Sequence, residues 1–165
     1  MFAAALAALA VLSGSFIGIT QDRVVPADTL IKLERTACFG ECPVYEVTID
    51  ARGNVTYVGR KFVRVQGRRT ARIPAARVAA LLDTAERIKF FELRNRYRTV
   101  RNPDGSETVV TDLPTTFVTI TRAGATKHVE DYYGAPDALR DLEQQIDEAA
   151  QTSQWVARKK RPTSH

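Results

Sequence analysis

The chain has two cysteines, Cys38 and Cys42, and they lie close together with Gly40 between them. Outside the cytoplasm neighbouring cysteines usually form a disulfide, and a glycine lets so short a loop fold back on itself. We therefore expect a crosslink that fixes the shape of this segment, the cysteine loop. A thiol redox pair and a metal site remain open as alternatives, although the spacing is not that of thioredoxin-like motifs and the histidines are few, His128 and His165.

Two aspartates are placed where they could act together. Asp112 opens a turn before the β-prone segment 116–121, and Asp131 opens a loop after the segment 126–129. If the two segments pair as a hairpin, both aspartates lie at its same end. Two carboxylates there could bind a cation or carry out acid–base chemistry. Alternatively, each aspartate caps its own turn through its side chain.

Aromatic side chains flank these segments. Tyr132 and Tyr133 follow Asp131 directly, and Tyr45 follows the cysteine loop. They could form a platform for a ligand or cover the core. Together with the two aspartates they are the candidate binding residues: Tyr45, Asp112, Asp131, Tyr132 and Tyr133. We interpret His128 as an ordinary strand histidine, and we assign no catalytic residue, metal site or cofactor.

The elements that must position these residues are hairpins and two helices. Segments 44–49 and 55–59 alternate apolar and polar residues around a glycine turn, which indicates a hairpin. Apolar residues at helical spacing predict amphipathic helices at about 75–89 and 136–150, each introduced by a proline. The fold class is therefore α+β, an antiparallel sheet built from hairpins with both helices packed on one face.

Less regular segments complete the sheet. We expect residues 62–65 to pair with 68–73, where the arginine content is high, and residues 96–101 to pair with 107–110 across an exposed turn. Residues 29–35 predict the first strand.

Length and charge fit one small globular domain. The chain has 165 residues, 44% of them hydrophobic, and a net charge of +5. Four positive charges lie in residues 158–161, so the charge is mostly local and a nucleic-acid partner is unexpected. We expect an N-terminal segment at 1–20, a linker at 21–28, the domain at 29–156 and a basic disordered tail at 157–165.

The first twenty residues contain no charged side chain. An apolar run followed by small residues is typical of a secretory signal peptide. Its length is also close to that of a membrane span, so an uncleaved anchor is an alternative, as is a buried N-terminal helix. The signal or anchor places the domain outside the cytoplasm, periplasmic or secreted, with the membrane reached only through this segment.

Three motifs resemble those of a known family. Residues 37–45 around the cysteines, 111–115 around Asp-Leu-Pro and 131–136 around Tyr-Tyr-Gly are similar to an uncharacterised family of small exported bacterial domains. The resemblance covers about residues 29–156. It implies an exported α+β domain of the cell envelope and carries no activity. The exposed turn at 102–107 departs from the family pattern and lies just ahead of the Asp-Leu-Pro motif.

Three functions are compatible with these observations. The first is a non-catalytic binding or interaction module of the bacterial cell envelope, whose partner is an envelope protein or a small ligand. It would use the cysteine loop, the Asp-Leu-Pro turn (112–115) and the Tyr-Tyr loop (131–134), because irregular segments on a stiff scaffold suit recognition. The second is a small periplasmic enzyme, either a thiol redox protein or a hydrolase using Asp112 and Asp131. The third is a structural accessory domain, whose loops would not converge.

Overall fold

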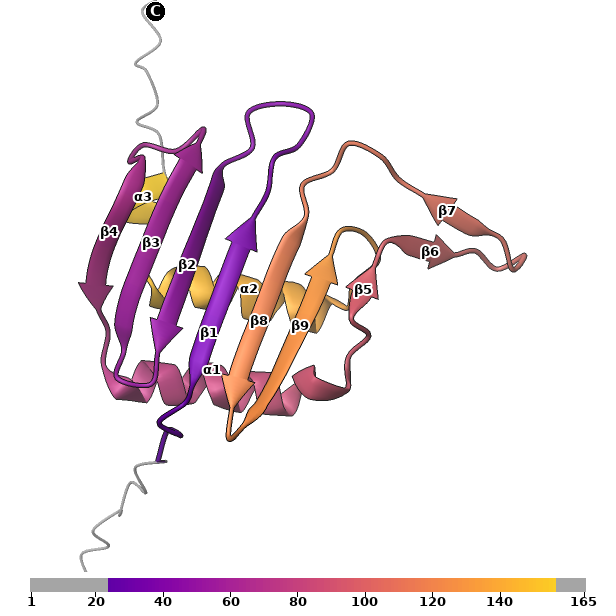
Figure 1. Ribbon diagram of the computed structural model, residues 1–165. Coiled ribbons are helices and arrows are strands. Elements are labelled where there is room, and N and C mark those ends of the chain that lie inside the picture. The colour runs from indigo at the N-terminus through magenta and orange to yellow at the C-terminus, as the bar shows by residue number, and fades with distance from the viewer. Residues whose placement is uncertain (1–23, 157–165) are drawn as a thin grey trace, which may run out of the picture.

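Seven strands form one sheet with its helices on a single face (Figure 1). The computed structural model describes residues 24–156. In spatial order the strands are β4 (Gly67–Arg72), β3 (Asn54–Lys61), β2 (Val44–Asp50), β1 (Leu30–Arg35), β8 (Thr116–Arg122), β9 (Ala125–Asp131) and β5 (Arg96–Tyr97). All neighbours are antiparallel except β5, which runs parallel to β9. The predicted α+β class is confirmed, with this one parallel edge making the sheet mixed.

Helices α1 (Ala75–Arg87) and α2 (Asp137–Ala149) cover the same face of the sheet (Figure 1). In both, the buried positions recur every three or four residues, so one stripe of each helix faces the strands. The predicted helices are therefore confirmed. The short helices are η1 (Phe90–Glu92) after α1 and α3 (Ser153–Val156) after α2.

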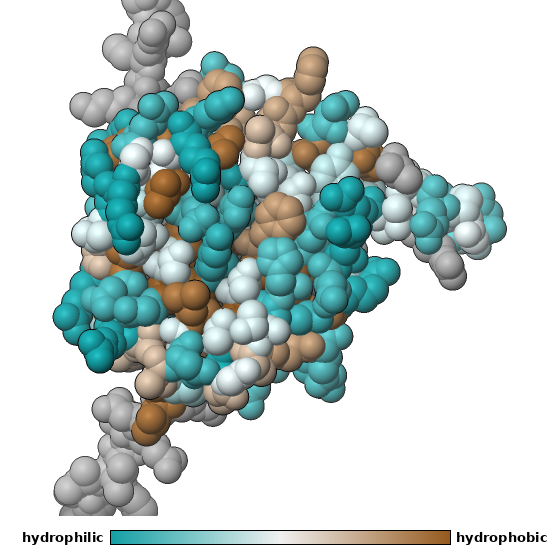
Figure 2. All heavy atoms as spheres, in the orientation of Figure 1, coloured by the Kyte–Doolittle hydropathy of each residue, from teal (hydrophilic) through white to brown (hydrophobic). Residues whose placement is uncertain are grey.

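The core lies between the sheet and the helices. Alternate strand residues point into it, including Ile31 and Leu33 of β1, because successive side chains in a strand face opposite sides. The other face of the sheet is uncovered and mainly hydrophilic (Figure 2). Lys32 lies there, 2.9 Å from Glu46. Residues of one strand thus divide between an apolar and a polar side, which fixes the register.

The expected pairing of 62–65 with 68–73 is wrong in its first half. Phe62 adopts a positive φ of 55°, which ends the extended conformation of β3. The N–H of Val65 then donates to the carbonyl oxygen of Trp155 at 2.9 Å, so this segment contacts the α3 turn instead of β4. β4 pairs with β3, with Thr70 opposite Thr56.

The predicted hairpin at 96–101 and 107–110 forms in part. β6 (Thr99–Arg101) pairs with β7 (Glu107–Val109) and projects away from the main sheet (Figure 1). The residues just before β6 are instead β5 at the edge of the main sheet. The hairpin thus projects from the main sheet, and the Asp-Leu-Pro turn follows it in the sequence.

Two expectations concern residues that the structure does not describe. The predicted signal or anchor at 1–20 and the basic tail at 157–165 lie outside residues 24–156. Within those residues, none of the helices has the length and apolar character that crossing a bilayer requires.

Candidate functional site

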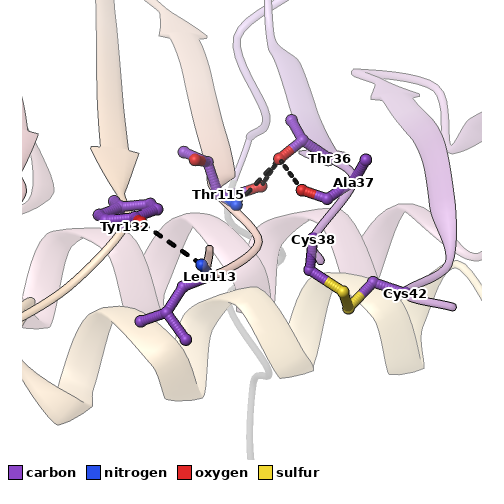
Figure 3. Close-up of a disulfide and its surroundings, with 7 residues drawn as sticks. All are labelled: Thr36, Ala37, Cys38, Cys42, Leu113, Thr115 and Tyr132. Carbon is purple, nitrogen blue, oxygen red and sulfur yellow. Dashed lines mark hydrogen bonds between the residues drawn. A yellow bond between two sulfur atoms is a disulfide. The ribbon is translucent and has the colours of Figure 1, made fainter. Parts of the chain in front are cut away.

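The three loops meet at the end of the sheet where β1 and β9 stop. The backbone N–H of Phe39 donates to the carbonyl oxygen of Asp112 at 3.3 Å. The N–H of Leu113 donates to the hydroxyl oxygen of Tyr132, also at 3.3 Å (Figure 3). The cysteine loop, the Asp-Leu-Pro turn and the Tyr-Tyr loop therefore lie side by side, contrary to what a structural accessory domain with separate loops predicts.

The cysteine loop is closed by a disulfide between Cys38 and Cys42, as the sequence predicts (Figure 3). Thr36 attaches its base to the neighbouring turn, because its hydroxyl accepts a hydrogen bond from the N–H of Thr115 at 2.9 Å. At the tip, the Phe39 side chain is 90% exposed. The loop is held in place at its base and presents an apolar side chain to solvent.

Beside these loops a cavity of about 540 Å³, the pocket, opens between the sheet and α2. Pro114 of the Asp-Leu-Pro turn and Tyr132 and Tyr133 of the Tyr-Tyr loop line it from outside the sheet. Its polar walls are formed by strand and helix residues: Arg35, Thr116, Asp131, Arg140 and Glu143. The pocket is therefore built by the scaffold on one side and by two of the three loops on the other.

Arg35 is the centre of a partly buried polar network. It continues the core-facing alternation of β1, so its guanidinium enters the space beneath the sheet. Its Nε and Nη2 donate to Oδ2 of Asp147 at 3.0 and 2.9 Å, and its Nη1 donates to Oγ1 of Thr116 at 3.1 Å. These contacts connect β1, β8 and α2, and Arg35 also lines the pocket.

Tyr45 belongs to the same network from β2. Its hydroxyl donates to Oδ1 of Asp147 at 2.8 Å and accepts from Nε of Arg35 at 3.0 Å. Burial and the negative charge of Asp147 raise the pKa of Tyr45 well above its usual value. Tyr45 therefore remains a neutral hydrogen-bonding residue that supports the pocket from behind.

Glu143 brings an unusual carboxyl group to the pocket. Its residue is only 4% exposed, and its Oε1 has no hydrogen-bond partner within residues 24–156. Its Oε2 lies 3.8 Å from Nη1 of Arg35. Burial and the nearby charge of Asp131 raise the pKa of Glu143 to about 8, although Arg35 opposes the shift. Near neutral pH this side chain is thus largely a protonated carboxylic acid.

Asp131 completes the polar wall from the end of β9, directly opposite Thr116 of β8. It is 9% exposed, and burial raises its pKa, while the charges of Arg140 and Arg35 act in the other direction. The pocket therefore holds two carboxyl groups that are both disfavoured as anions, with guanidinium groups on either side. Such a pair can accept, donate or exchange a proton with a bound molecule.

The family model described as a domain of unknown function (DUF6438) matches residues 29–150. The chain belongs to the DUF6438 family. No curated protein matches it. The matched range runs from the start of the sheet through α2 and includes every residue that lines the pocket. The pocket of this chain thus lies within the matched domain.

The DUF6438 domain brings some predicted site residues together and leaves others apart. Asp131, Tyr132 and Tyr133 line the pocket, and Tyr45 lies behind it. Asp112 is exposed and does not line the pocket; its backbone carbonyl oxygen accepts the hydrogen bond from Phe39 of the cysteine loop. The carboxyl group that shares the pocket with Asp131 is instead Glu143.

His128 lies on the opposite side of the sheet. Its ring stacks on Phe117 with a centroid distance of 5.3 Å, and its Nδ1 is 2.8 Å from the hydroxyl of Thr119. These contacts are those of an ordinary strand histidine, away from the pocket.

The residues that sequence reasoning missed are the polar ones beneath the sheet: Arg35, Arg140, Glu143 and Asp147. The sequence does carry a signal for two of them. Glu143 interrupts the apolar stripe of α2 between Leu139 and Ile146. Arg35 extends the buried alternation of β1. A charged residue at a position that the pattern assigns to the core must find a partner or a function, because burying an isolated charge is costly.

A metal ion is not favoured by the donors of this domain. Within the described residues no group of three or more His, Cys, Asp or Glu side chains is arranged to hold one. The two carboxyl groups of the pocket fall short of the ligand sets that Zn²⁺ and Ca²⁺ require from proteins.

Proposed function

We propose that this DUF6438 domain is a non-catalytic binding module of the bacterial cell envelope and that the pocket is its binding site. The observation that carries the proposal is the convergence of the three loops beside a polar cavity of about 540 Å³. Ligand sites are typically concave, with a few polar groups held in place by a rigid scaffold.

Export to the envelope rests on two features. Residues 1–20 form an uncharged apolar segment of the kind that directs secretion. The Cys38–Cys42 disulfide requires an oxidising compartment to persist. The domain would act in the periplasm or after secretion, or from the inner membrane if the N-terminal segment is retained.

Capture from envelope extract tests the proposal. The double variant Asp131→Ala/Tyr132→Ala removes a carboxylate of the wall and an aromatic of the rim. Asp141→Ala is the matched control, since Asp141 is an exposed acid of α2 outside the pocket. We expect the wild type and the control to retain the same partner or ligand and the double variant to lose it. Identical captured material from all three proteins would contradict the proposal.

A second candidate is an acid–base hydrolase, because Glu143 and Asp131 line the same pocket and burial raises the pKa of Glu143 to about 8. A general acid and a carboxylate with separated protonation states are the groups that hydrolysis of a glycoside or ester uses. Assays with chromogenic glycosides and esters test this candidate. Turnover that Glu143→Gln abolishes and Asp141→Asn preserves would support it, whereas activity equal in both variants would exclude it.

A further inference from the structure

Two arginines and two acidic residues line the pocket: Arg35, Arg140, Asp131 and Glu143. The guanidinium of Arg35 is paired with Asp147 at 2.9 Å, and that of Arg140 with Asp137 at 2.5 Å. Each arginine of the wall therefore has its own carboxylate. Of the two acids in the lining, Asp131 forms no ion pair within residues 24–156, and Glu143 has only the longer contact of 3.8 Å with Arg35.

Both of these acids have open hydrogen-bonding capacity. Oε1 of Glu143 is buried with no hydrogen-bond partner among residues 24–156. Within the same residues, the Asp131 carboxylate forms no side-chain ion pair or hydrogen bond, and Arg140 and Arg35 act on it only through their charges. The buried, unpartnered Oε1 of Glu143 costs stability, and a donor on a molecule bound in the pocket would relieve that cost.

The size and rim of the pocket indicate what that molecule is. A cavity of about 540 Å³ is much larger than a bare ion needs, and it falls in the range of small organic ligands. Tyr132 and Tyr133 are half-buried at its rim, where aromatic rings favour a cationic group over a neutral one. The guanidinium of Arg98 already lies over the Tyr132 ring, 6.0 Å from its centroid, so Tyr133 is the ring that we assign to the ligand. An ammonium group offers both a positive charge and several N–H donors in one compact unit.

We propose that the pocket binds a small organic amine through its protonated ammonium group, with Asp131 and Glu143 as the acceptors and the Tyr133 ring at the rim. This inference rests on the proposed function, because it takes the pocket to be the binding site. The ligand class is thus an ammonium-bearing molecule rather than an anion, a neutral polyol or a metal ion.

Binding of an ammonium group is coupled to the protonation of Glu143. Asp131 of β9 and Asp147 of α2 favour the protonated carboxyl, whereas Arg35 of β1 and a hydrogen bond from Thr116 of β8 favour the anion. An arriving positive charge shifts this balance toward the anion, so Glu143 releases its proton. Near neutral pH, amine binding therefore releases up to one proton into the buffer.

Ethanolamine and its neutral derivative N-acetylethanolamine are the probes that test the proposal. Amide chemical shifts of Tyr133 and Gly134 are followed by NMR during titration of the full domain. We expect saturable shifts with ethanolamine and none with N-acetylethanolamine. Glu143→Gln and Asp131→Asn should each weaken ethanolamine binding by about tenfold, as loss of a buried charge pair does, while Asp141→Asn should not. Thermal melting confirms that each variant is folded.

Calorimetry in two buffers with different ionisation heats supplies a second readout. We expect proton release on ethanolamine binding to the wild type and none for Glu143→Gln. Equal binding of the two probes, or no ethanolamine binding, would overturn the ammonium class. The binding module would survive either result if envelope capture still depends on Asp131 and Tyr132, so the two proposals can fail separately.

Discussion

The cysteine loop and the part of the pocket lining formed by Arg35 and Glu143, here called the floor, are neighbours that are held in place by different interactions. The loop is closed covalently between Cys38 and Cys42, and its tip residue Phe39 is 90% exposed. The floor is held by hydrogen bonds and charges around Arg35, and Glu143 there is 4% exposed. The loop is thus fixed in shape without unusual chemistry, while the floor has shifted protonation equilibria. The cysteines, which stand out in the sequence, lie beside the pocket, whereas buried residues such as Glu143 supply its ionisable groups.

The largest loss of stability is expected when the guanidinium of Arg35 is removed from the floor of the pocket. Arg35→Met leaves Asp147 and Tyr45 without their cation beneath the sheet, and breaking a buried pair is strongly destabilising. Because the guanidinium is partly exposed, we expect a loss of about 3 kcal/mol in the free energy of unfolding. Urea denaturation measures it. Arg60→Met is the control, since Arg60 forms a surface pair with Glu46 at 3.7 Å and should cost under about 1 kcal/mol.

Glu143 should make stability depend on pH in a definite direction. Its pKa is raised in the fold to about 8 from an ordinary 4.5, so the folded state holds the proton more tightly. Its stabilising contribution is complete below about pH 4.5 and is lost as pH rises to about 8. Relative to Glu143→Gln, we expect the wild type to lose stability over this range by at most about 1.4 kcal/mol for each unit of the pKa shift, part of the change being shared with Asp131. Thermal melting of both proteins against pH measures it, and parallel curves would contradict it.

Opening the disulfide should have a smaller and more local effect. Cys38→Ser/Cys42→Ser releases a very short loop, so the domain should lose less than about 3 kcal/mol of stability in the chain-entropy model. Amide hydrogen exchange should increase at Phe39, which donates to Asp112, and remain unchanged in the sheet. Equal exchange at Phe39 before and after the change would show that the disulfide does not hold the loop against the turn.

The smallest loss of stability is expected when the contact between the Asp-Leu-Pro turn and the Tyr-Tyr loop is removed. Tyr132→Phe removes the acceptor for the N–H of Leu113, an exposed hydrogen bond of 3.3 Å. We expect a loss of under about 1 kcal/mol in unfolding free energy, as for an ordinary hydrogen bond. The NMR shift of the Leu113 amide should nevertheless change, which separates a local loosening from a global one.

The architecture followed from local patterns because those patterns are properties of single elements. Alternation predicted β2 and β3, and helical spacing predicted α1 and α2, since each signal lies within one segment. Phe62–Val65 was mispredicted because its conformation depends on Trp155, which lies far along the chain. Local propensity cannot report such a contact, and the parallel pairing of β5 with β9 has the same origin.

Pocket residues could be predicted from the sequence only where they stand next to one another in a motif. Asp131, Tyr132 and Tyr133 stand together in the sequence, and they line the pocket. Glu143 and Arg35 come from opposite halves of the chain, so only the fold shows that they meet. The same holds for their protonation, because burial and neighbouring charges shift a pKa and neither is visible in a local pattern.

The protonation of Glu143 tests the account most directly, and it can be followed by the carbon-13 shift of its carboxyl group during a pH titration. A buried acid on the pocket floor should titrate with a midpoint near 8, and the midpoint should fall when Asp131 is replaced by asparagine. A midpoint below about 5 that is unaffected by Asp131→Asn would show an ordinary solvated carboxylate. That result would contradict the assignment of this pocket as the chemically specialised part of the molecule.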